Sequence, residues 1–419
     1  MQDVAPQPIR HGHRTCAWRT WLRLSLVPLW WDVWFTHMEG MRVTFLLMLP
    51  EFRPEYHLNI DMGIIPRLLR ESHGWNVVIA SEEKHELPSG MVSVGFGTGR
   101  LDSLKCVWWN AKAIDVLQLM HFTWRTVVRA LVYKLGHRSG ICYVKLDLGE
   151  PAMRDLEALS NRWYWRWVFS VGLRVVDMVS AESTEMRSRF EGFMRRCLPR
   201  VHKHPQMILL PACGFPVERV LKRAPVPQPR IDILYVGRIG AWQKGTEVLL
   251  EAFRLAVERH GARATLQMVG RTEPAFDGIF KKWQESVSSE TKSLVCVHPP
   301  IVDRDALIDI YLNAKVLAIS SRYEGVPNVL LEALACGCRI VATPVGQVPD
   351  ALRIKERGWQ VPIDDPVSFA EALAAALREP DSAEARQRRI IDFGREYSWT
   401  EHVAGLATCL LNIAEAKRP

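Results

Sequence analysis

Residues 231–253 read IDILYVGRIGAWQKGTEVLLEAF, and this stretch decides the class of fold. It opens with a short apolar run, which predicts a buried strand, and closes with the apolar spacing of an amphipathic helix. Gly237 ends the apolar run and Gly245 begins the helical part. Two cations, Arg238 and Lys244, stand between the glycines. Because glycines allow close backbone approach and Arg and Lys both bind diphosphate, the stretch predicts a strand, an anion-binding loop and a helix.

The same alternation of apolar and helical segments continues along the chain in both directions. Strands are predicted at 42–49, 76–80, 114–120, 141–147, 174–180, 207–211, 231–236, 264–269, 294–298, 316–320, 339–343 and 358–363. Helices are predicted at 61–72, 122–137, 151–170, 182–197, 245–260, 275–289, 304–313, 328–336 and 366–378. Strands and helices in alternation are typical of parallel, doubly wound sheets, so an α/β fold is expected.

The length of 419 residues exceeds what one hydrophobic core usually organises, which predicts two domains. The Pro-rich, basic stretch KRAPVPQPR interrupts the alternation and predicts a linker. We expect an N-terminal extension at 1–40, a first domain at 41–220, a linker at 221–230, a second domain at 231–392 and a C-terminal helix at 393–419 that packs back on the first domain. Open α/β sheets bind ligands at their strand ends, so the site is expected in a cleft between the domains.

Charge and tryptophan are distributed unevenly along the chain. The excess of Lys and Arg over Asp and Glu is +7 for residues 1–220 and +1 for residues 221–419, and 12 of the 16 tryptophans precede residue 168. The overall composition, 48% hydrophobic and 24% charged, is that of a globular protein and excludes a disordered, collagenous or polytopic membrane protein. The skew indicates that the first half meets an anionic surface.

The nine cysteines are scattered, odd in number and without a C-x-x-C pair. This favours reduced thiols in a cytoplasmic protein over a disulfide framework or a zinc site. Cys336 and Cys338 form the one close pair, and we expect them to act as small hydrophobic residues.

Residues 21–35 are apolar and follow three arginines, which in part resembles a secretion signal. Arg23, Pro28 and Asp32 interrupt the run, no small-residue cleavage site follows, and a bilayer span needs about 18 to 20 apolar residues. Two interpretations of residues 1–40 stay open. They form an ill-ordered or untranslated extension, or a Trp-rich anchor in the membrane interface.

A second motif, SSRYEGVPNVLLEALACG at 320–337, contains the carboxylates Glu324 and Glu332. Gly325 and Pro327 predict a tight turn between a strand and a helix, which places Glu324 in the loop and Glu332 inside the helix. At such a helix start the amides of Val329 and Leu330 are expected to be free and to favour a phosphate. One carboxylate can then accept hydrogen bonds from a sugar and the other from a ribose. The alternative is that Glu324 is a turn residue and Glu332 a helix-surface residue.

Together these motifs resemble the retaining glycosyltransferases of family 4, which have the GT-B fold. The matching elements, in chain order, are G-R-x5-K-G at 237–245, E-G-x-P-N-V-L-L-E-A-x-A-x-G at 324–337, ATPVG at 342–346 and FGREYSW at 393–399. The resemblance covers residues 231–400 closely and residues 41–220 more weakly. It implies two Rossmann-like doubly wound domains that face a central cleft, the first binding the acceptor and the second the nucleotide sugar.

Carried over residue by residue, the resemblance implies that Arg238 and Lys244 hold the donor diphosphate and stabilise its charge as it leaves. Glu324 would contact the hydroxyls of the transferred sugar, and Glu332 would bind the ribose. Residues around Val302 would line the base pocket. The full set of expected donor-binding residues is Gly237, Arg238, Lys244, Val302, Glu324, Gly325, Val326, Pro327, Asn328, Val329, Leu330 and Glu332.

One competing motif points to a metal. Asp303, Arg304 and Asp305 match the D-x-D pattern by which another glycosyltransferase fold holds a metal ion and a diphosphate. Here the two aspartates open a predicted helix, where they are expected as caps and dipole partners. The resemblance implies no metal and no cofactor, with cationic side chains in their place.

The acceptor side departs from the family pattern. The histidine that many members carry at the end of a middle strand is missing from 141–147, which ends Lys145, Leu146, Asp147. His121, after the preceding strand, is the nearest alternative, and it is either catalytic or a structural residue. Asp147 is a second candidate, because a carboxylate at a strand end can steer an acceptor hydroxyl.

The resemblance implies a hexosyltransferase-type enzyme that moves a sugar from a UDP- or GDP-sugar with retention. We expect a saccharide acceptor, such as a lipid-linked saccharide or a polysaccharide or lipopolysaccharide precursor, at the inner face of the plasma membrane. RWYWRW at 162–167 mixes cations and aromatics as membrane-interface segments do, or it belongs to a buried helix with one charged edge. No nucleic-acid partner is expected. A nucleotide-sugar epimerase on the same fold and a non-catalytic nucleotide-sugar-binding protein are the alternatives.

Overall fold

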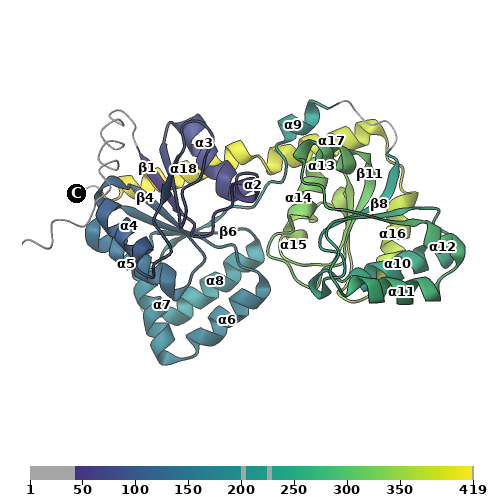
Figure 1. Ribbon diagram of the computed structural model, residues 1–419, viewed down its shortest axis with the longest axis horizontal. Coiled ribbons are helices and arrows are strands. Elements are labelled where there is room, and N and C mark those ends of the chain that lie inside the picture. Colours follow the sequence, from purple (N-terminus) through teal and green to yellow (C-terminus); the bar gives the residue numbers. More distant parts are fainter. Residues whose placement is uncertain (1–42, 200–203, 224–228, 418–419) are drawn as a thin grey trace, which may run out of the picture. The chain divides into compact units, whose positions relative to one another are not determined.

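The computed structural model describes residues 43–199, 204–223 and 229–417 (Figure 1). The expectations for residues 1–40 lie outside the described residues. Within the described part of the chain, no helix is both long and apolar enough to cross a bilayer.

The first half of the chain forms a seven-stranded parallel sheet in the order β3-β2-β1-β4-β5-β6-β7. Its strands are β1 (Thr44–Met48), β2 (Asn76–Ser81), β3 (Val92–Gly95), β4 (Val116–Met120), β5 (Ile141–Lys145), β6 (Met178–Ala181) and β7 (Gln206–Leu209). The strand order reverses between β1 and β4. In a doubly wound sheet this reversal leaves a crevice at the carboxyl ends of the strands.

Helices connect these parallel strands. They are α2 (Pro54–His57), α3 (Asp61–His73), α4 (Asp102–Asn110), α5 (Trp124–Gly136), α6 (Glu150–Ser160), α7 (Trp163–Val175), α8 (Thr184–Cys197) and α9 (Val217–Leu221). The strands read as continuous apolar runs because they are buried; all six residues of β2, for example, are buried.

The second half forms a six-stranded parallel sheet in the order β10-β9-β8-β11-β12-β13, which reverses between β8 and β11. Its strands are β8 (Ile231–Val236), β9 (Leu266–Val269), β10 (Val295–His298), β11 (Ala314–Ile319), β12 (Arg339–Ala342) and β13 (Gly358–Gln360). The helices are α10 (Thr246–Glu258), α11 (Phe276–Ser286), α12 (Ser289–Ser293), α13 (Arg304–Asn313), α14 (Asn328–Ala335), α15 (Val348–Ala351), α16 (Pro366–Arg378), α17 (Ala383–Glu396) and α18 (Trp399–Glu415). Two doubly wound sheets confirm the predicted fold class.

Several predicted segments are wrong in detail. The single helix expected at 151–170 is two helices, because α6 ends at Ser160 and Arg162 takes an extended conformation before α7. α7 then continues to Val175, so the strand expected from 174 begins only at Met178. The helix expected at 275–289 is divided into α11 and α12, and β3, α4 and α17 were not predicted.

The last helix, α18, packs against α3 and β5 of the first sheet (Figure 1). Trp399 begins it, is buried, and donates its indole N–H to the carbonyl of Gly214 at 3.1 Å. The 221–230 segment runs from the end of α9 to the start of β8, and residues 224–228 lie outside the described residues.

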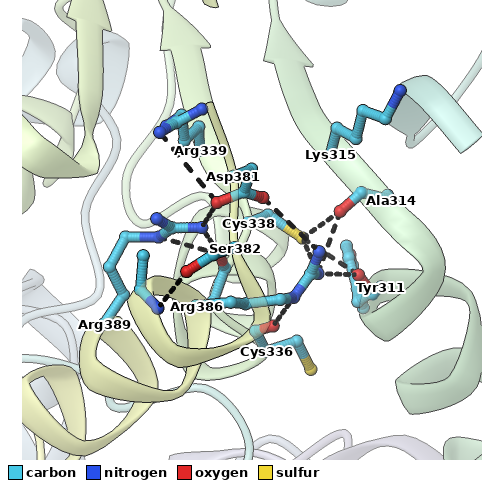
Figure 2. A network of polar contacts seen from close by, with 12 residues as sticks. Tyr311, Ala314, Lys315, Cys336, Cys338, Arg339, Asp381, Ser382, Arg386 and Arg389 are labelled. Atoms are coloured by element: carbon cyan, nitrogen blue, oxygen red, sulfur yellow. Dashed lines mark hydrogen bonds and ion pairs between the residues drawn. The ribbon is translucent and has the colours of Figure 1, made fainter. Parts of the chain in front are cut away.

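A buried arginine connects α17 to the ends of two neighbouring helices (Figure 2). The guanidinium of Arg386 donates to the carbonyls of Tyr311, Ala314 and Cys336, which lie at the C-terminal ends of α13 and α14. Helix ends leave such carbonyls without partners inside the helix, so the guanidinium satisfies them.

The thiol of Cys338 donates to the Tyr311 carbonyl at 3.0 Å, and burial raises the pKa of Cys338. Cys336 and Cys338 are both fully buried.

Candidate active site

A partly buried ion pair lies at the point where the second sheet reverses. Lys244 belongs to the loop after β8 and Glu324 to the loop after β11. Lys244 Nζ donates to Glu324 Oε1 at 2.5 Å, and their side chains are 17% and 9% exposed. Ser321 Oγ donates to the same oxygen at 2.6 Å, while Gln243 Nε2 donates to Oε2 at 3.3 Å. Three donors therefore hold the Glu324 carboxylate in one place.

Gly245 allows this approach. Its φ is +58°, and a Cβ at this position would lie 2.2 Å from the carbonyl oxygen of Ser320. Ser320 Oγ in turn donates to the carbonyl of Lys244 at 2.9 Å. Only glycine fits this turn, so Gly245 fixes Lys244 against the loop that carries Glu324.

Gln243 also joins Arg238 to the ion pair. Arg238 directly follows Gly237, the first residue after β8, and its Nη2 donates to Gln243 Oε1 at 2.7 Å. The Arg238 side chain is half exposed, so its guanidinium is accessible to an anion. The structure thus brings Arg238, Lys244 and Glu324 together through Gln243, a residue that was not among the predicted site residues.

Glu332 lies in α14, as predicted, but its side chain is buried rather than on the helix surface. Its Oε1 accepts from Arg304 Nη1 at 2.8 Å, and its Oε2 accepts from the Tyr311 hydroxyl at 3.0 Å. Burial and the Glu332 charge raise the pKa of Tyr311. Arg304 also lies over the ring of Phe215 at 4.4 Å. The interpretation of Glu332 as a surface residue is therefore wrong.

The other donor-site residues are placed around the start of α14. Pro327 precedes the helix, Asn328 begins it, and Val326 and Val329 are half buried against the core. The expectation of a free Leu330 amide is wrong, because this amide donates to the Pro327 carbonyl at 2.9 Å. Gly325 follows Glu324 directly, and both line one cavity. Val302 is 85% exposed in the loop before α13.

The two aspartates of the D-x-D motif bind groups of the protein itself. Asp303 Oδ1 accepts from the Ala306 amide at 2.7 Å, which confirms it as the N-cap of α13. Asp305 forms ion pairs with Arg219 at 2.7 Å and Arg223 at 2.6 Å. Among residues 43–199, 204–223 and 229–417, no group of three or more His, Cys, Asp or Glu side chains is arranged to hold a metal.

His121 and Asp147 lie on neighbouring strand ends of the first sheet. His121 follows β4 directly with a φ of +57°, and Asp147 follows the end of β5 by two residues. The His121 Nδ1 atom is buried and has no hydrogen-bond partner among the described residues. Burial lowers the pKa of His121; nearby Asp147 opposes this shift, and Lys145 adds to it. The imidazole is therefore neutral at pH 7.

A buried charge cluster beside them was missed by the sequence analysis. Lys145, at the end of β5, is 1% exposed, lies 2.5 Å from Asp61 Oδ2 and donates to Glu182 Oε1. Asp61 begins α3, and Glu182 follows β6. Burial raises the pKa of Glu182 to about 8, with contributions of the same sign from Asp147 and Asp61, while Lys145 opposes the shift.

One cavity of about 220 Å³ is lined by residues from both halves of the chain, including Glu182 and Glu324. From the first sheet it is lined by Leu146, Leu148 and Glu182, and from the second by Glu324 and Gly325, among others. The cavity therefore lies at the carboxyl ends of strands from both sheets, where open α/β folds bind ligands. Carboxylates from opposite sides, Glu182 and Glu324, face this space.

Residues 230–379 match the family described as Glycosyl transferases group 1. The D-inositol 3-phosphate glycosyltransferase of Saccharomonospora viridis is 30% identical over 178 residues, which are 42% of this chain and 41% of that protein. The protein of the same name from Thermobispora bispora is 28% identical over 316 residues, or 74% of this chain and 70% of that protein. The chain spans about two fifths of the length of the first of these relatives.

Solved structures share the fold at low sequence identity. The Anabaena protein HepE, in complex with UDP and glucose, superposes with a TM-score of 0.62 at 14% identity, covering 88% of this chain and all of that one. A UDP-forming trehalose-phosphate synthase from Burkholderia xenovorans superposes with a TM-score of 0.66 at 14% identity, covering 89% of this chain and all of that one. Both have the same architecture of two doubly wound sheets.

Proposed function

Since residues 230–379 belong to the glycosyl transferases group 1 family and the chain is a member of family 4 of the GT-B glycosyltransferases, we propose that it transfers a sugar from a nucleotide-sugar donor to an acceptor hydroxyl. The observation that carries the proposal is the group formed by Arg238, Gln243, Lys244 and Glu324 beside a cavity at the strand ends. A leaving nucleoside diphosphate needs cations to stabilise its charge, and this group supplies two.

The proposed reaction is a front-face displacement with retention. The bond between the anomeric carbon and the β-phosphate oxygen breaks, and its electron pair stays on the phosphate oxygen. The acceptor oxygen forms the new bond to the anomeric carbon from the same face, and its proton passes to the departing phosphate oxygen. Lys244 and Arg238 stabilise the diphosphate, so the step needs no protein base.

The carboxylates bind the uncharged parts of the nucleotide sugar, which are the transferred sugar and the ribose. Glu324, fixed by three donors, accepts hydrogen bonds from hydroxyls of the transferred sugar, and Glu332 accepts from the ribose. On the acceptor side, neutral His121 lies beside the reacting sugar and Asp147 orients the acceptor hydroxyl. The first turn of α14, with the Val329 amide, lies against the diphosphate. Val302, in the exposed loop before α13, contacts the base.

The solved relatives with bound UDP or UDP-glucose analogues support a UDP-sugar as the first donor to test, with a GDP-sugar as the alternative. A thermal-shift comparison of UDP-, GDP- and ADP-sugars tests the proposal, because a ligand that binds the folded state raises its melting temperature by mass action. A shift with one base class supports a donor site. If none of them shifts the melting temperature at millimolar concentration, the proposal is wrong.

For the acceptor we propose a lipid-linked saccharide or another precursor of a polysaccharide or lipopolysaccharide, at the inner face of the plasma membrane. The support is the surface of α5 and α7, where Trp124, Trp163 and Trp167 are exposed beside Arg125, Arg162 and Arg166. Aromatic and cationic side chains together favour the membrane interface. Liposome flotation with anionic and neutral vesicles checks the location.

A nucleotide-sugar epimerase on the same fold is the alternative, and the transferase relatives do not favour it. An epimerase would convert the donor sugar without an acceptor, whereas a transferase joins the sugar to a new hydroxyl. Chromatography of the reaction products separates these outcomes. We also propose that catalysis needs no metal, since Arg238 and Lys244 occupy the place where a cation would act.

A further inference from the structure

A second, larger cavity lies within the first half of the chain. It has a volume of about 440 Å³ and is partly open to solvent, and its lining comes from the start of α5, from α6 and from α7. Its walls are mainly apolar, and they include Phe122, Trp124, Leu148, Leu156, Trp165 and Phe169. The volume falls within the range of about 300–1,000 Å³ that is typical of ligand pockets.

The cavity is apolar inside and polar at its mouth. Phe122, Leu156 and Phe169 are buried, and the ring of Trp165 stacks on that of Phe169 at a centroid distance of 5.7 Å. The charged lining residues, Arg125 and Asp155, are exposed. Ordered water needs two to four polar partners, so such an interior favours a hydrocarbon ligand over water.

The apolar cavity adjoins the candidate active site. Leu148 lines both the apolar cavity and the cavity that contains Glu182 and Glu324. Phe122 and Leu148, which line the apolar cavity, directly follow His121 and Asp147 in the chain. A molecule with its polar end among the catalytic candidates can therefore extend past Leu148 into the apolar space.

We propose that this cavity binds the hydrocarbon chain of an amphiphilic acceptor. The inference rests on the proposed function for the identity of the polar end, which presents the hydroxyl in the Glu182–Glu324 cavity. Such a lipid enters from the membrane interface. This interface contacts the charges at the mouth of the cavity and the exposed Trp163 and Trp167 of α7. The specificity of the enzyme then includes the length of the acceptor's chain, since each buried methylene raises affinity about 4-fold.

Binding of n-octyl, n-nonyl and n-decyl β-D-glucosides, titrated calorimetrically below their micelle concentrations, tests the inference. Affinity should rise about 4-fold per added methylene until the cavity is full. Ala152 lines the cavity from the exposed side of α6, so Ala152→Phe fills it without a change in the core. This variant should lose at least 10-fold in affinity for the decyl glucoside.

Ala158→Phe is the matched control. Ala158 is an exposed residue of the same helix that does not line the cavity, so this variant should bind like the wild type. Affinity that is independent of chain length, or an equal loss in both variants, would overturn the inference. The donor readout is separate: the melting-temperature shift with UDP-glucose should be the same in both variants. If no nucleotide sugar shifts the wild type, the proposed function fails while the alkyl series still reports on the cavity.

Discussion

Replacing Lys244 distinguishes its contribution to catalysis from its contribution to stability through the ion pair with Glu324. In Lys244→Ala the Glu324 carboxylate loses one of three donors, while Ser321 and Gln243 still hold it. A hydrogen bond to a charged group contributes about 1.5–3 kcal/mol, and a folded domain has about 5–15 kcal/mol of stability. The variant should therefore fold, with a melting temperature that is several degrees lower.

The effect on catalysis should be much larger. Removing one preorganised group that stabilises transition-state charge lowers kcat about 10²–10³-fold. The assay is the release of UDP from UDP-glucose, with water or the identified acceptor as nucleophile, followed by a coupled spectrophotometric reaction. The double variant Lys244→Met with Glu324→Gln removes both charges and should regain stability without regaining activity. Near-normal release by Lys244→Ala, or recovery of activity in the double variant, would refute the reasoning.

Three further predictions follow from the same residues. The pKa of Glu182 is raised from its ordinary value of 4.5 to about 8, so the folded protein holds an extra proton between these pH values. The free energy of unfolding should therefore fall as pH rises from 5 to 8, and Glu182→Gln should flatten this slope in urea titrations. A slope in the variant equal to that of the wild type would contradict the assignment. Tyr311→Phe removes one hydrogen-bond donor from buried Glu332 and should lower the free energy of unfolding by about 1.5–3 kcal/mol. The variant should also have a higher KM for the nucleotide sugar, and an unchanged KM would argue against a contact between Glu332 and the ribose. Addition of EDTA should leave UDP release unchanged, and a loss that a divalent ion restores would show that a metal is required.

The loops that carry Arg238, Lys244 and Glu324 were predictable because their signals are local. The strand β8 was expected at 231–236 and found at the same residues, since the Pro-rich segment before it and Gly237 after it bound the apolar run. Arg238 and Lys244 lie in the loop that follows, and Glu324 lies in the loop before α14, so the position of each depends on a few neighbouring residues. Pairing of Lys244 with Glu324 then follows from the adjacency of β8 and β11.

Some of the missed features depend on contacts between distant segments, and others depend on local backbone geometry. Asp61, Lys145 and Glu182 belong to three separate elements and meet only because β5 and β6 are neighbours in the sheet and α3 begins nearby. The break between α6 and α7 has no Gly or Pro to mark it, since Asn161 and Arg162 occupy the junction. The Leu330 amide turns back to the Pro327 carbonyl in the first turn of α14, a local geometry that residue type does not reveal.

Part of the charge skew of the first half lies in the described residues, on the surface of the protein. Among the described residues of the first half, the buried cation near the active site is Lys145, and it contacts Asp61 and Glu182, so it adds no unpaired positive charge there. Arg125 of α5, Arg162 just before α7 and Arg166 of α7 are instead exposed, and Arg125 lines the apolar cavity. Cations at the surface act on an anionic interface over about 10 Å, the screening length at 0.1 M salt, whereas cations inside a site select a charged substrate. The distribution therefore favours an anionic membrane surface as the partner of the first half, and it predicts an acceptor whose reacting end is itself uncharged.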